Sequence, residues 1–276
     1  MNIKTWAQQF KTDMMVKRYD EDDTIPNYVS QIKQFLGYFE TRYDHPKHIP
    51  AEAVKEYLLS KDMVNTQRHS HSAIKLFYKL TVHQEFKFRY IEYAKKEKKL
   101  PQIIEEDEIQ LIIDTCTNLK HKTIICLLYA CGLRVSEVIN MKIAHLNKDT
   151  IDIICAKGKK DRIVPMPVSI VKLISDYRAQ YNPVEYMFNG QFGPQYSERS
   201  INQFLKDIAK KAGIVKNIHA HLLRHSYATH SLEQGIDIYS LKEILGHNDT
   251  KTTSGYLHCS RKSIGRIHSP INNIRL

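Results

Sequence analysis

The sequence has few cysteines and no spacing that pairs them. Its five cysteines contain no Cys-x-x-Cys motif and no matched arrangement with histidine, which argues against a disulfide framework and against a zinc site. We expect free and mostly buried thiols instead, because an unpaired cysteine behaves as a small apolar residue. The five are Cys116, Cys126, Cys131, Cys155 and Cys259.

Long apolar segments are also missing. The longest, residues 124–133, is much shorter than the ~20 apolar residues that a helix needs to cross a bilayer. The N-terminal sequence MNIKTWAQQF lacks the charged and then apolar pattern of a secretory signal. No internal repeat and no low-complexity tract interrupts the chain. We therefore expect a soluble, cytoplasmic protein with no membrane partner.

What the chain has in excess is positive charge. Among 276 residues, 42% are hydrophobic and the net charge is +11, with an isoelectric point near 9.2. The length favours two domains, and the charge is shared, with +5 over the first 100 residues and +6 over the rest. A basic balance in both parts is expected of a protein that lies along a polyanion, although many basic proteins never bind one.

The first 93 residues are predicted to form a helical domain. Apolar residues recur at helical spacing in residues 28–39 and 69–80, and residues 51–59 follow a proline. Residues 94–101, AKKEKKLP, combine a charge run with a proline and are predicted to be a linker. The apolar positions are Tyr28, Ile32, Phe35 and Phe39 in the first helix and Ala73, Leu76, Phe77 and Leu80 in the second.

Residues 102–276 are predicted to form a second domain that is mainly helical with one small antiparallel β-hairpin. Its strands are the β-prone residues 151–155 and 162–165, on either side of the basic turn 157–161. The acidic residues 105–108 favour the start of a helix, because negative charge stabilises a helix N-terminus. Further helices are expected at residues 197–212, 222–234 and 238–245, with Gly235 and Gly246 where the last two end.

Three segments concentrate cations and imidazoles. In ACGLRVSEVI, residues 130–139, Gly132 ends one helix and Arg134 begins the next, where its charge opposes the helix dipole. An anion bound opposite Arg134 would explain that placement, and Glu137 could orient the guanidinium; an ordinary surface salt bridge is the alternative. The second segment is the hairpin turn, where Lys157 is either simply exposed or carried into a groove.

The third segment is HAHLLRHSYATH, residues 219–230. His221 and Arg224 are three residues apart and share a face of a helix. This pair suits a phosphate, because arginine binds two oxygens and histidine moves a proton near neutral pH. Downstream, LGHNDTKTTSGY places His247 after a helix end and Tyr256 nine residues later. Each of these features alone is most often structural.

Together these segments resemble those of the tyrosine recombinases, the phage-integrase family, over about residues 95–270. GLRVSE corresponds to the family's first arginine motif, KGKKDRIVP to its hairpin lysine, HLLRHSYATH to its H-x-x-R helix, ILGH to its L-G-H turn and TTSGY to its nucleophile motif. The N-terminal helices match the family's SAM-like core-binding domain only in general character. The resemblance implies six catalytic residues: Arg134, Lys157, His221, Arg224, His247 and Tyr256.

The chemistry explains the arginines and the tyrosine. Tyr256 would attack a DNA phosphodiester, although a phenol with a pKa of about 10 is a poor nucleophile at neutral pH. The phosphate gains negative charge as a fifth oxygen approaches. Arg134 and Arg224 would hold its two non-bridging oxygens and offset that charge.

The other three residues would move protons and add a hydrogen bond. His221 is the candidate base for the tyrosine proton, His247 contributes a further hydrogen bond, and Lys157 would protonate the departing 5′ oxygen. The implied product is a 3′-phosphotyrosyl bond, which stores the energy of the broken linkage. We therefore expect no cofactor and no metal ion.

Other residues near these motifs are interpreted as secondary to the chemistry. Tyr227 and Tyr239 are expected to pack against the core, and Asp161 and Arg162 to fix the hairpin. His219 is the weakest of several extra imidazoles that could contact the phosphate. The others are His225, His230 and His258.

The resemblance also implies an assembly. The segment from about residue 261 is expected either to pack on its own domain or to dock on a neighbouring subunit, as in family members. We expect a tetramer on double-stranded DNA with paired inverted recombination sites, associated with the nucleoid. Because the helical pattern begins almost at residue 1, we expect no arm-binding domain of the kind found in larger integrases.

Two alternatives remain open. A relative that has lost catalysis would only occupy DNA, although the intact set of six residues argues against this. A type IB topoisomerase-like enzyme would relax supercoils as a monomer, although a separate N-terminal helical domain and a short tail fit recombinases better. Among recombinases, a Xer-type resolvase, a small integrase and an inverting enzyme all fit the pattern.

Overall fold

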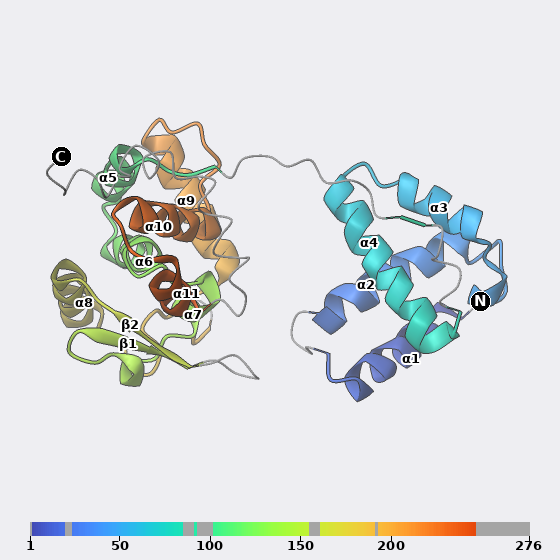
Figure 1. The fold of residues 1–276 in the computed structure, drawn as a ribbon. Coiled ribbons are helices and arrows are strands. Elements are labelled where there is room, and N and C mark those ends of the chain that lie inside the picture. Colours follow the sequence, from blue (N-terminus) through green and yellow to red (C-terminus); the bar gives the residue numbers. More distant parts are fainter. Residues whose placement is uncertain are drawn as a thin grey trace, which may run out of the picture. The chain divides into compact units, whose positions relative to one another are not determined.

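The chain forms two compact units, Met1–Lys99 and Leu100–Leu276 (Figure 1). Each unit has its own hydrophobic core. The described residues are mainly helical with one two-stranded antiparallel sheet, which confirms the predicted fold class. None of the helices in this part of the chain is both long and apolar enough to span a membrane. The structure, a computed structural model, describes residues 2–19, 24–84, 91–92, 102–154, 161–190 and 193–246.

Helices build the described part of the first unit. Its first helix begins after Asn2, whose side chain accepts a hydrogen bond from the Thr5 amide (3.2 Å) and so satisfies an amide left open at the helix N-terminus. The elements are α1 (Ile3–Val16), α2 (Thr24–Phe39), a 3-10 turn (Pro46–His48), α3 (Ala51–Leu59), α4 (Val64–Phe77) and a π-helical turn (Tyr78–Val82).

The core of the first unit is aromatic. Phe35 of α2 is fully buried and lies edge-on to Phe39, Tyr57 and Tyr78, with ring centroids 5.3, 5.3 and 6.2 Å away. Pairs in this geometry add about 0.5–1.5 kcal/mol each beyond the burial of area. The helix predicted over residues 28–39 is therefore confirmed, and its aromatic stripe is core.

The helix predicted over residues 69–80 begins earlier and ends differently. Ala73 and Phe77 are buried as expected, but Tyr78 enters the core while Leu80 is only partly buried. The reason is the π-helical turn, which adds a residue to the turn and rotates the side chains that follow. The Tyr78 hydroxyl donates to the Pro46 carbonyl (2.8 Å), and burial raises the pKa of Tyr78.

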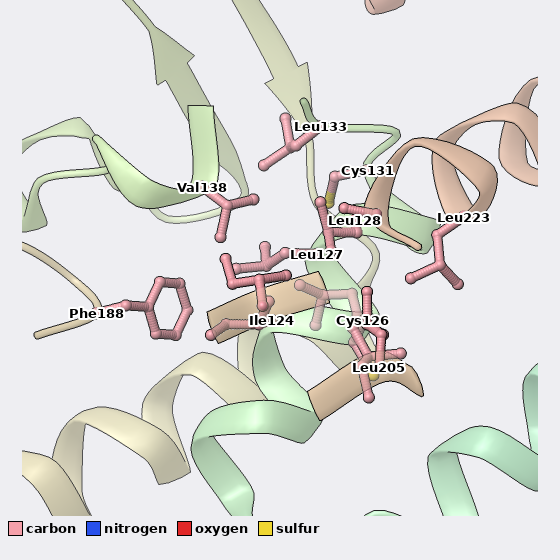
Figure 2. Close-up of a cluster of buried hydrophobic side chains, with 14 of the residues drawn as sticks. Ile124, Cys126, Leu127, Leu128, Cys131, Leu133, Val138, Phe188, Leu205 and Leu223 are labelled. Carbon is pink, nitrogen blue, oxygen red and sulfur yellow. The ribbon is translucent and has the colours of Figure 1, made fainter. Parts of the chain in front are cut away.

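The second unit surrounds α6, which is apolar from Ile124 to Ala130 and buried from Thr123 to Leu128. Such a helix is stable only when other elements enclose it, and α8 and α10 pack against it. The elements of this unit are α5 (Glu106–Thr115), α6 (Leu119–Ala130), α7 (Val135–Ile139), a 3-10 turn (Ile143–His145), β1 (Thr150–Ile153), β2 (Arg162–Pro165), α8 (Val168–Tyr181), α9 (Glu198–Lys211), α10 (Ala220–Glu233) and α11 (Ile238–Leu245). Figure 2 shows Ile124, Leu127 and Leu128 of α6 among Val138, Phe188, Leu205 and Leu223.

The helices predicted in the second unit are present with small shifts at their ends. Residues 197–212, 222–234 and 238–245 correspond to α9, α10 and α11. Gly235 and Gly246 follow the last two with φ angles of 97° and 62°, the left-handed conformation that glycine adopts without strain. The sequence interpretation did not include α8, although its buried residues recur at helical spacing. These are Ile170, Ile174 and Tyr177.

The predicted hairpin is present with a shorter first strand. Ile151 of β1 lies opposite Val164 of β2, and Ile153 lies opposite Arg162. Partners in the ladder share a face, and faces alternate along each strand. Val164 and Arg162 therefore point to the interior, and Ile163 between them is 66% exposed. The turn with Lys157 lies outside the described residues, as does the predicted linker at residues 94–101.

Three of the predicted free thiols are buried in the second unit. They belong to Cys116, Cys126 and Cys131. Burial raises the pKa of Cys126 to about 11 and that of Cys131 to about 12, so both thiols stay protonated and unreactive at neutral pH. Cys155 and Cys259 lie outside the described residues.

Replacing Leu127 by alanine should destabilise the second unit alone. Leu127 is fully buried, and a buried Leu-to-Ala change costs about 2–5 kcal/mol. The single tryptophan, Trp6, belongs to the first unit, so its fluorescence reports on that unit and circular dichroism reports on both. In urea, Leu127→Ala should lower the dichroism midpoint and leave the fluorescence transition in place. Leu111→Ala is the control, because Leu111 is 46% exposed; an equal shift in that variant would contradict the prediction.

Candidate active site

Arg224 lies in the first half of α10 and is almost fully buried, with 1% of its side chain exposed. Its Nη1 donates to the Gly132 carbonyl (2.7 Å) and its Nη2 to the Leu245 carbonyl (2.6 Å). These carbonyls lie at the C-terminal ends of α6 and α11, where helix dipoles leave partial negative charge. Two helix ends therefore hold the guanidinium in one orientation.

Arg134 stands at the start of α7, as predicted, and 29% of its side chain is exposed. Its Nη1 donates to Glu137 Oε1 (2.8 Å) and its Nη2 to the Gly246 carbonyl (2.9 Å). The Arg134 amide also donates to Glu137 Oε2 (2.8 Å). Glu137 thus accepts a hydrogen bond from an amide left open at the start of α7, and it orients the Arg134 side chain, as the sequence suggested.

Glu137 is shared with a third arginine. Arg162 at the start of β2 donates from Nη1 and Nη2 to the two carboxylate oxygens of Glu137, both at 2.8 Å, and from Nε to the Ile244 carbonyl (2.7 Å). Burial alone would raise the pKa of Glu137, but the hydrogen bonds and charge of Arg162, and then those of Arg134, lower it to about 2. The carboxylate is therefore charged at any physiological pH. Arg162 thus connects β2 to α7 and α11, which is consistent with the expectation that it fixes the hairpin.

The last turn of α11 provides three of these contacts in succession. A helix leaves its final carbonyls without intrahelical partners. Here the carbonyls of Ile244, Leu245 and Gly246 each accept a hydrogen bond from a different arginine. Gly246 has a left-handed backbone conformation, which turns the chain so that its carbonyl also faces an arginine. The donors, in the same order, are Arg162, Arg224 and Arg134.

A pocket of about 260 Å³ opens beside this cluster. Arg134 comes from α7, while His221 and Arg224 come from the first turns of α10. The Asn202 side chain accepts a hydrogen bond from the Ala220 amide (3.0 Å) and so holds the start of α10 in place. The full lining is Leu133, Arg134, Val135, Ser136, Glu198, Asn202, His219, Ala220, His221 and Arg224.

The environment of His221 favours the neutral form of its imidazole. Burial lowers its pKa, and the nearby Arg224 guanidinium lowers it further. The ring of His225 lies edge-on to that of His221, with centroids 4.3 Å apart. Burial, followed by the charge of His221, lowers the pKa of His225 to about 4. Both rings are therefore neutral at pH 7, and a neutral imidazole has a nitrogen lone pair that can take a proton.

Three of the six predicted catalytic residues thus line one pocket: Arg134, His221 and Arg224. Lys157, His247 and Tyr256 lie outside the described residues, as do His258 and the segment from about residue 261. Their roles stay predictions.

Two neighbouring aromatic residues differ in their burial. Tyr227 packs against the backbone of Gly132, as expected. Tyr239 was expected to pack as well, and this is wrong: its side chain is 70% exposed. It lies in the first turn of α11 and points away from the side that buries Leu241 and Leu245.

The extra histidines have separate environments. His230 is 4% exposed, and its Nδ1 lies 2.9 Å from the Tyr129 hydroxyl, so it is a buried structural residue that does not line the pocket. His219, the weakest candidate from the sequence, does line it. Asn202 also lines the pocket and belongs to no sequence motif, because its partner at the start of α10 lies 18 residues away in the chain.

Comparison with known proteins agrees with this arrangement. Residues 102–263 match the phage integrase family, and residues 6–87 match the N-terminal SAM-like domain of phage integrases. The chain belongs to the phage integrase family. The resemblance drawn from the motifs is confirmed, and so is that drawn from the general character of the N-terminal helices.

Relatives of this family member match nearly its whole length. Tyrosine recombinase XerC of Staphylococcus aureus strain JH9 is 30% identical over 285 residues, which cover 95% of this chain and 94% of the relative. The XerC of strain USA300 is 30% identical over 283 residues, covering 94% and 93%. This member of the phage integrase family is a site-specific tyrosine recombinase, an enzyme of DNA recombination.

Solved structures share its fold. XerA recombinase is 26% identical with a TM-score of 0.58, covering 97% of this chain and 100% of that one. XerH recombinase bound to a palindromic difH substrate is 22% identical with a TM-score of 0.70, covering 87% and 77%. A lambda integrase dimer bound to a COC′ core site is 16% identical with a TM-score of 0.75, covering 97% and 79%. At the last two identities the likeness shows the fold alone.

Replacing Gly132 by alanine should destabilise the recombinase more than the same change at Gly213. Both glycines have positive φ, 58° and 71°, and a side chain there costs about 1–2 kcal/mol. A methyl group at Gly132 would also overlap the Tyr227 ring, whereas nothing lies within 4 Å of one at Gly213. Overpacking adds about 1–3 kcal/mol. Urea denaturation followed by circular dichroism measures the free energy of unfolding of both variants. Equal losses of stability would contradict the predicted overlap with the Tyr227 ring.

Proposed function

We propose that this recombinase cleaves and rejoins DNA strands through a 3′-phosphotyrosyl intermediate with Tyr256 as the nucleophile. The observation that carries the proposal is the pocket in which Arg134, Arg224 and His221 converge. Two guanidinium groups suit the non-bridging oxygens of a phosphodiester. Their hydrogen bonds to helix ends and to Glu137 hold them there before a substrate arrives, so little reorganisation accompanies the reaction.

The proposed cleavage step balances as follows. The Tyr256 oxygen forms a bond to phosphorus while the bond from phosphorus to the 5′ oxygen breaks. His221 takes the phenol proton, and Lys157 gives a proton to the 5′ oxygen. His247 adds a hydrogen bond to the phosphate. The phosphotyrosyl bond retains the energy of the broken linkage, so a 5′-hydroxyl of another strand can reverse the step without ATP.

The proposed substrate is double-stranded DNA with paired inverted sites, exchanged within a tetramer. The net charge of +11, carried by both units, supports a polyanionic partner. XerH was solved with palindromic difH, lambda integrase as a dimer on a core site, and the Tn1549 integrase with transposon right end DNA. The identity to XerC over nearly the whole chain favours a Xer-type resolvase over a small integrase or an inverting enzyme.

Covalent capture tests the nucleophile. A library of nicked duplexes with randomised inverted half-sites is incubated with the full chain, and DNA attached to denatured protein is recovered and sequenced. The unmodified protein should yield a defined site, and Tyr256→Phe should yield no adduct. Tyr239→Phe is the control, because Tyr239 is exposed and lies on the preceding helix. Absence of an adduct with the unmodified protein, or an adduct with Tyr256→Phe, refutes the proposal.

The acid side of the pH profile tests the base. Because the pKa of His221 lies below the ordinary 6.5, the neutral form persists as pH falls through that value. Single-turnover cleavage should change by less than about twofold between pH 6.5 and 8 and should decline only at lower pH. His221→Gln should cleave roughly 10²- to 10⁴-fold more slowly, the usual contribution of a general base. His48→Gln, at an exposed histidine of the first unit, is the control; an unchanged rate in His221→Gln contradicts the assignment.

A further inference from the structure

Arg162 occupies a position that strand patterning disfavours. It shares the inward face of β2 with Val164, and its side chain is 7% exposed, while Ile163 between them is 66% exposed. Arginine is almost never fully buried unless it is paired. The strand therefore exposes an isoleucine and buries a guanidinium, which indicates that the contacts of Arg162 compensate for that inversion.

Those contacts reach three elements. The two Nη atoms bind both oxygens of Glu137 on α7, and Nε binds the Ile244 carbonyl on α11. The side chain also lies against the backbone after α11, because a Cβ at Gly246 would come within 3.0 Å of its Cδ and Nη1. Arg162 is absent from the lining of the pocket. It therefore acts on the site through Glu137 and the end of α11.

The charges around Glu137 show what Arg162 changes. The carboxylate lies 2.8 Å from Arg134, 2.8 Å from Arg162 and 3.8 Å from Arg224, so three positive groups face one negative group. Without Arg162, the two arginines of the pocket alone would compensate the carboxylate. Pair energies are large at these distances in a buried site, and a carboxylate that has lost Arg162 would attract both remaining guanidinium groups away from a phosphate.

We propose that Arg162 is a positioning residue that binds both oxygens of Glu137. The positive charges of Arg134 and Arg224 then stay available to the scissile phosphate, and both side chains keep their orientation. This inference rests on the proposed function of the pocket. It assigns to the strand after the hairpin turn an electrostatic task in cleavage, in addition to holding the hairpin against α11. Arg162 itself does not touch the substrate.

A charge-balanced pair of variants tests the inference. Arg162→Met leaves the two pocket arginines alone to compensate Glu137, so the excess of positive charge falls from two to one. Glu137→Gln with Arg162→Met removes one charge of each sign and restores an excess of two positive charges. Single-turnover cleavage of the captured nicked site by Arg162→Met should slow roughly 10- to 100-fold, comparable to the loss of one transition-state hydrogen bond. The double variant should recover at least about tenfold of that loss, because the charge of the pocket returns. If Arg162 only held the hairpin in place, the double variant should not cleave faster than Arg162→Met.

DNA affinity separates this effect from misfolding. Binding of the same duplex should stay within about twofold in each variant, because phosphate contacts along the whole interface dominate affinity. Arg178→Met removes one exposed positive charge on α8 and should leave cleavage unchanged. A double variant no faster than Arg162→Met, or Arg162→Met as fast as the unmodified protein, overturns the inference.

Arg162→Lys covers the case in which Arg162→Met does not fold by circular dichroism. Lysine keeps the charge but cannot bind both oxygens and the Ile244 carbonyl in one plane. Its cleavage rate should fall roughly three- to tenfold at unchanged DNA affinity, and an unchanged rate overturns the inference. The unmodified protein and Tyr256→Phe accompany every assay. If the unmodified protein forms no adduct, the proposed function has failed; if it does and the variants match it, only the role of Arg162 has failed.

Discussion

The buried carboxylate of Glu137 is the group on which the rest of the site depends. A charge removed from water is stable only when hydrogen-bonded partners of opposite charge surround it. Arg134 and Arg162 both bind the carboxylate at 2.8 Å, and Arg224 lies 3.8 Å away. Each arginine also binds a backbone carbonyl at a helix end. Charge pairing and helix packing therefore specify the same arrangement, and a change in either would disturb both.

The C-terminal turn of α11 is the second partner of this cluster. Open carbonyls at a helix end require donors when they are buried, and three arginines from β2, α10 and α7 supply them. The arginines in turn need acceptors to compensate for the water they have lost. Because each requirement satisfies the other, groups of the protein itself hold the three arginines in place. Helix α6, buried from Thr123 to Leu128, gives these elements a common support, and the Gly132 carbonyl that follows it accepts a hydrogen bond from Arg224.

Much of the fold follows from local patterns. Periodicity and glycine placement predicted α9, α10 and α11 to within two residues, because each of these helices has a clear start or stop signal. Sequence patterns were less informative where packing against other elements decides the burial of a side chain. The π-helical turn that brings Tyr78 into the core and the exposure of Tyr239 both depend on what packs against the helix. Helix α8 was not predicted, although Ile170, Ile174 and Tyr177 recur at helical spacing.

The sequence by itself predicted the chemistry of this recombinase, from an arginine motif, an H-x-x-R helix and a T-T-x-x-Y motif in one order. These residue types belong together because a phosphodiester needs cations, a base and a nucleophile. Only the tertiary structure decided that Arg162 shares Glu137 with Arg134, and that Asn202 holds the start of α10. Arg162 and Glu137 lie 25 residues apart in the chain, and Asn202 lies 18 residues from Ala220. No local pattern encodes such contacts, because they arise only when elements distant in the sequence pack against one another.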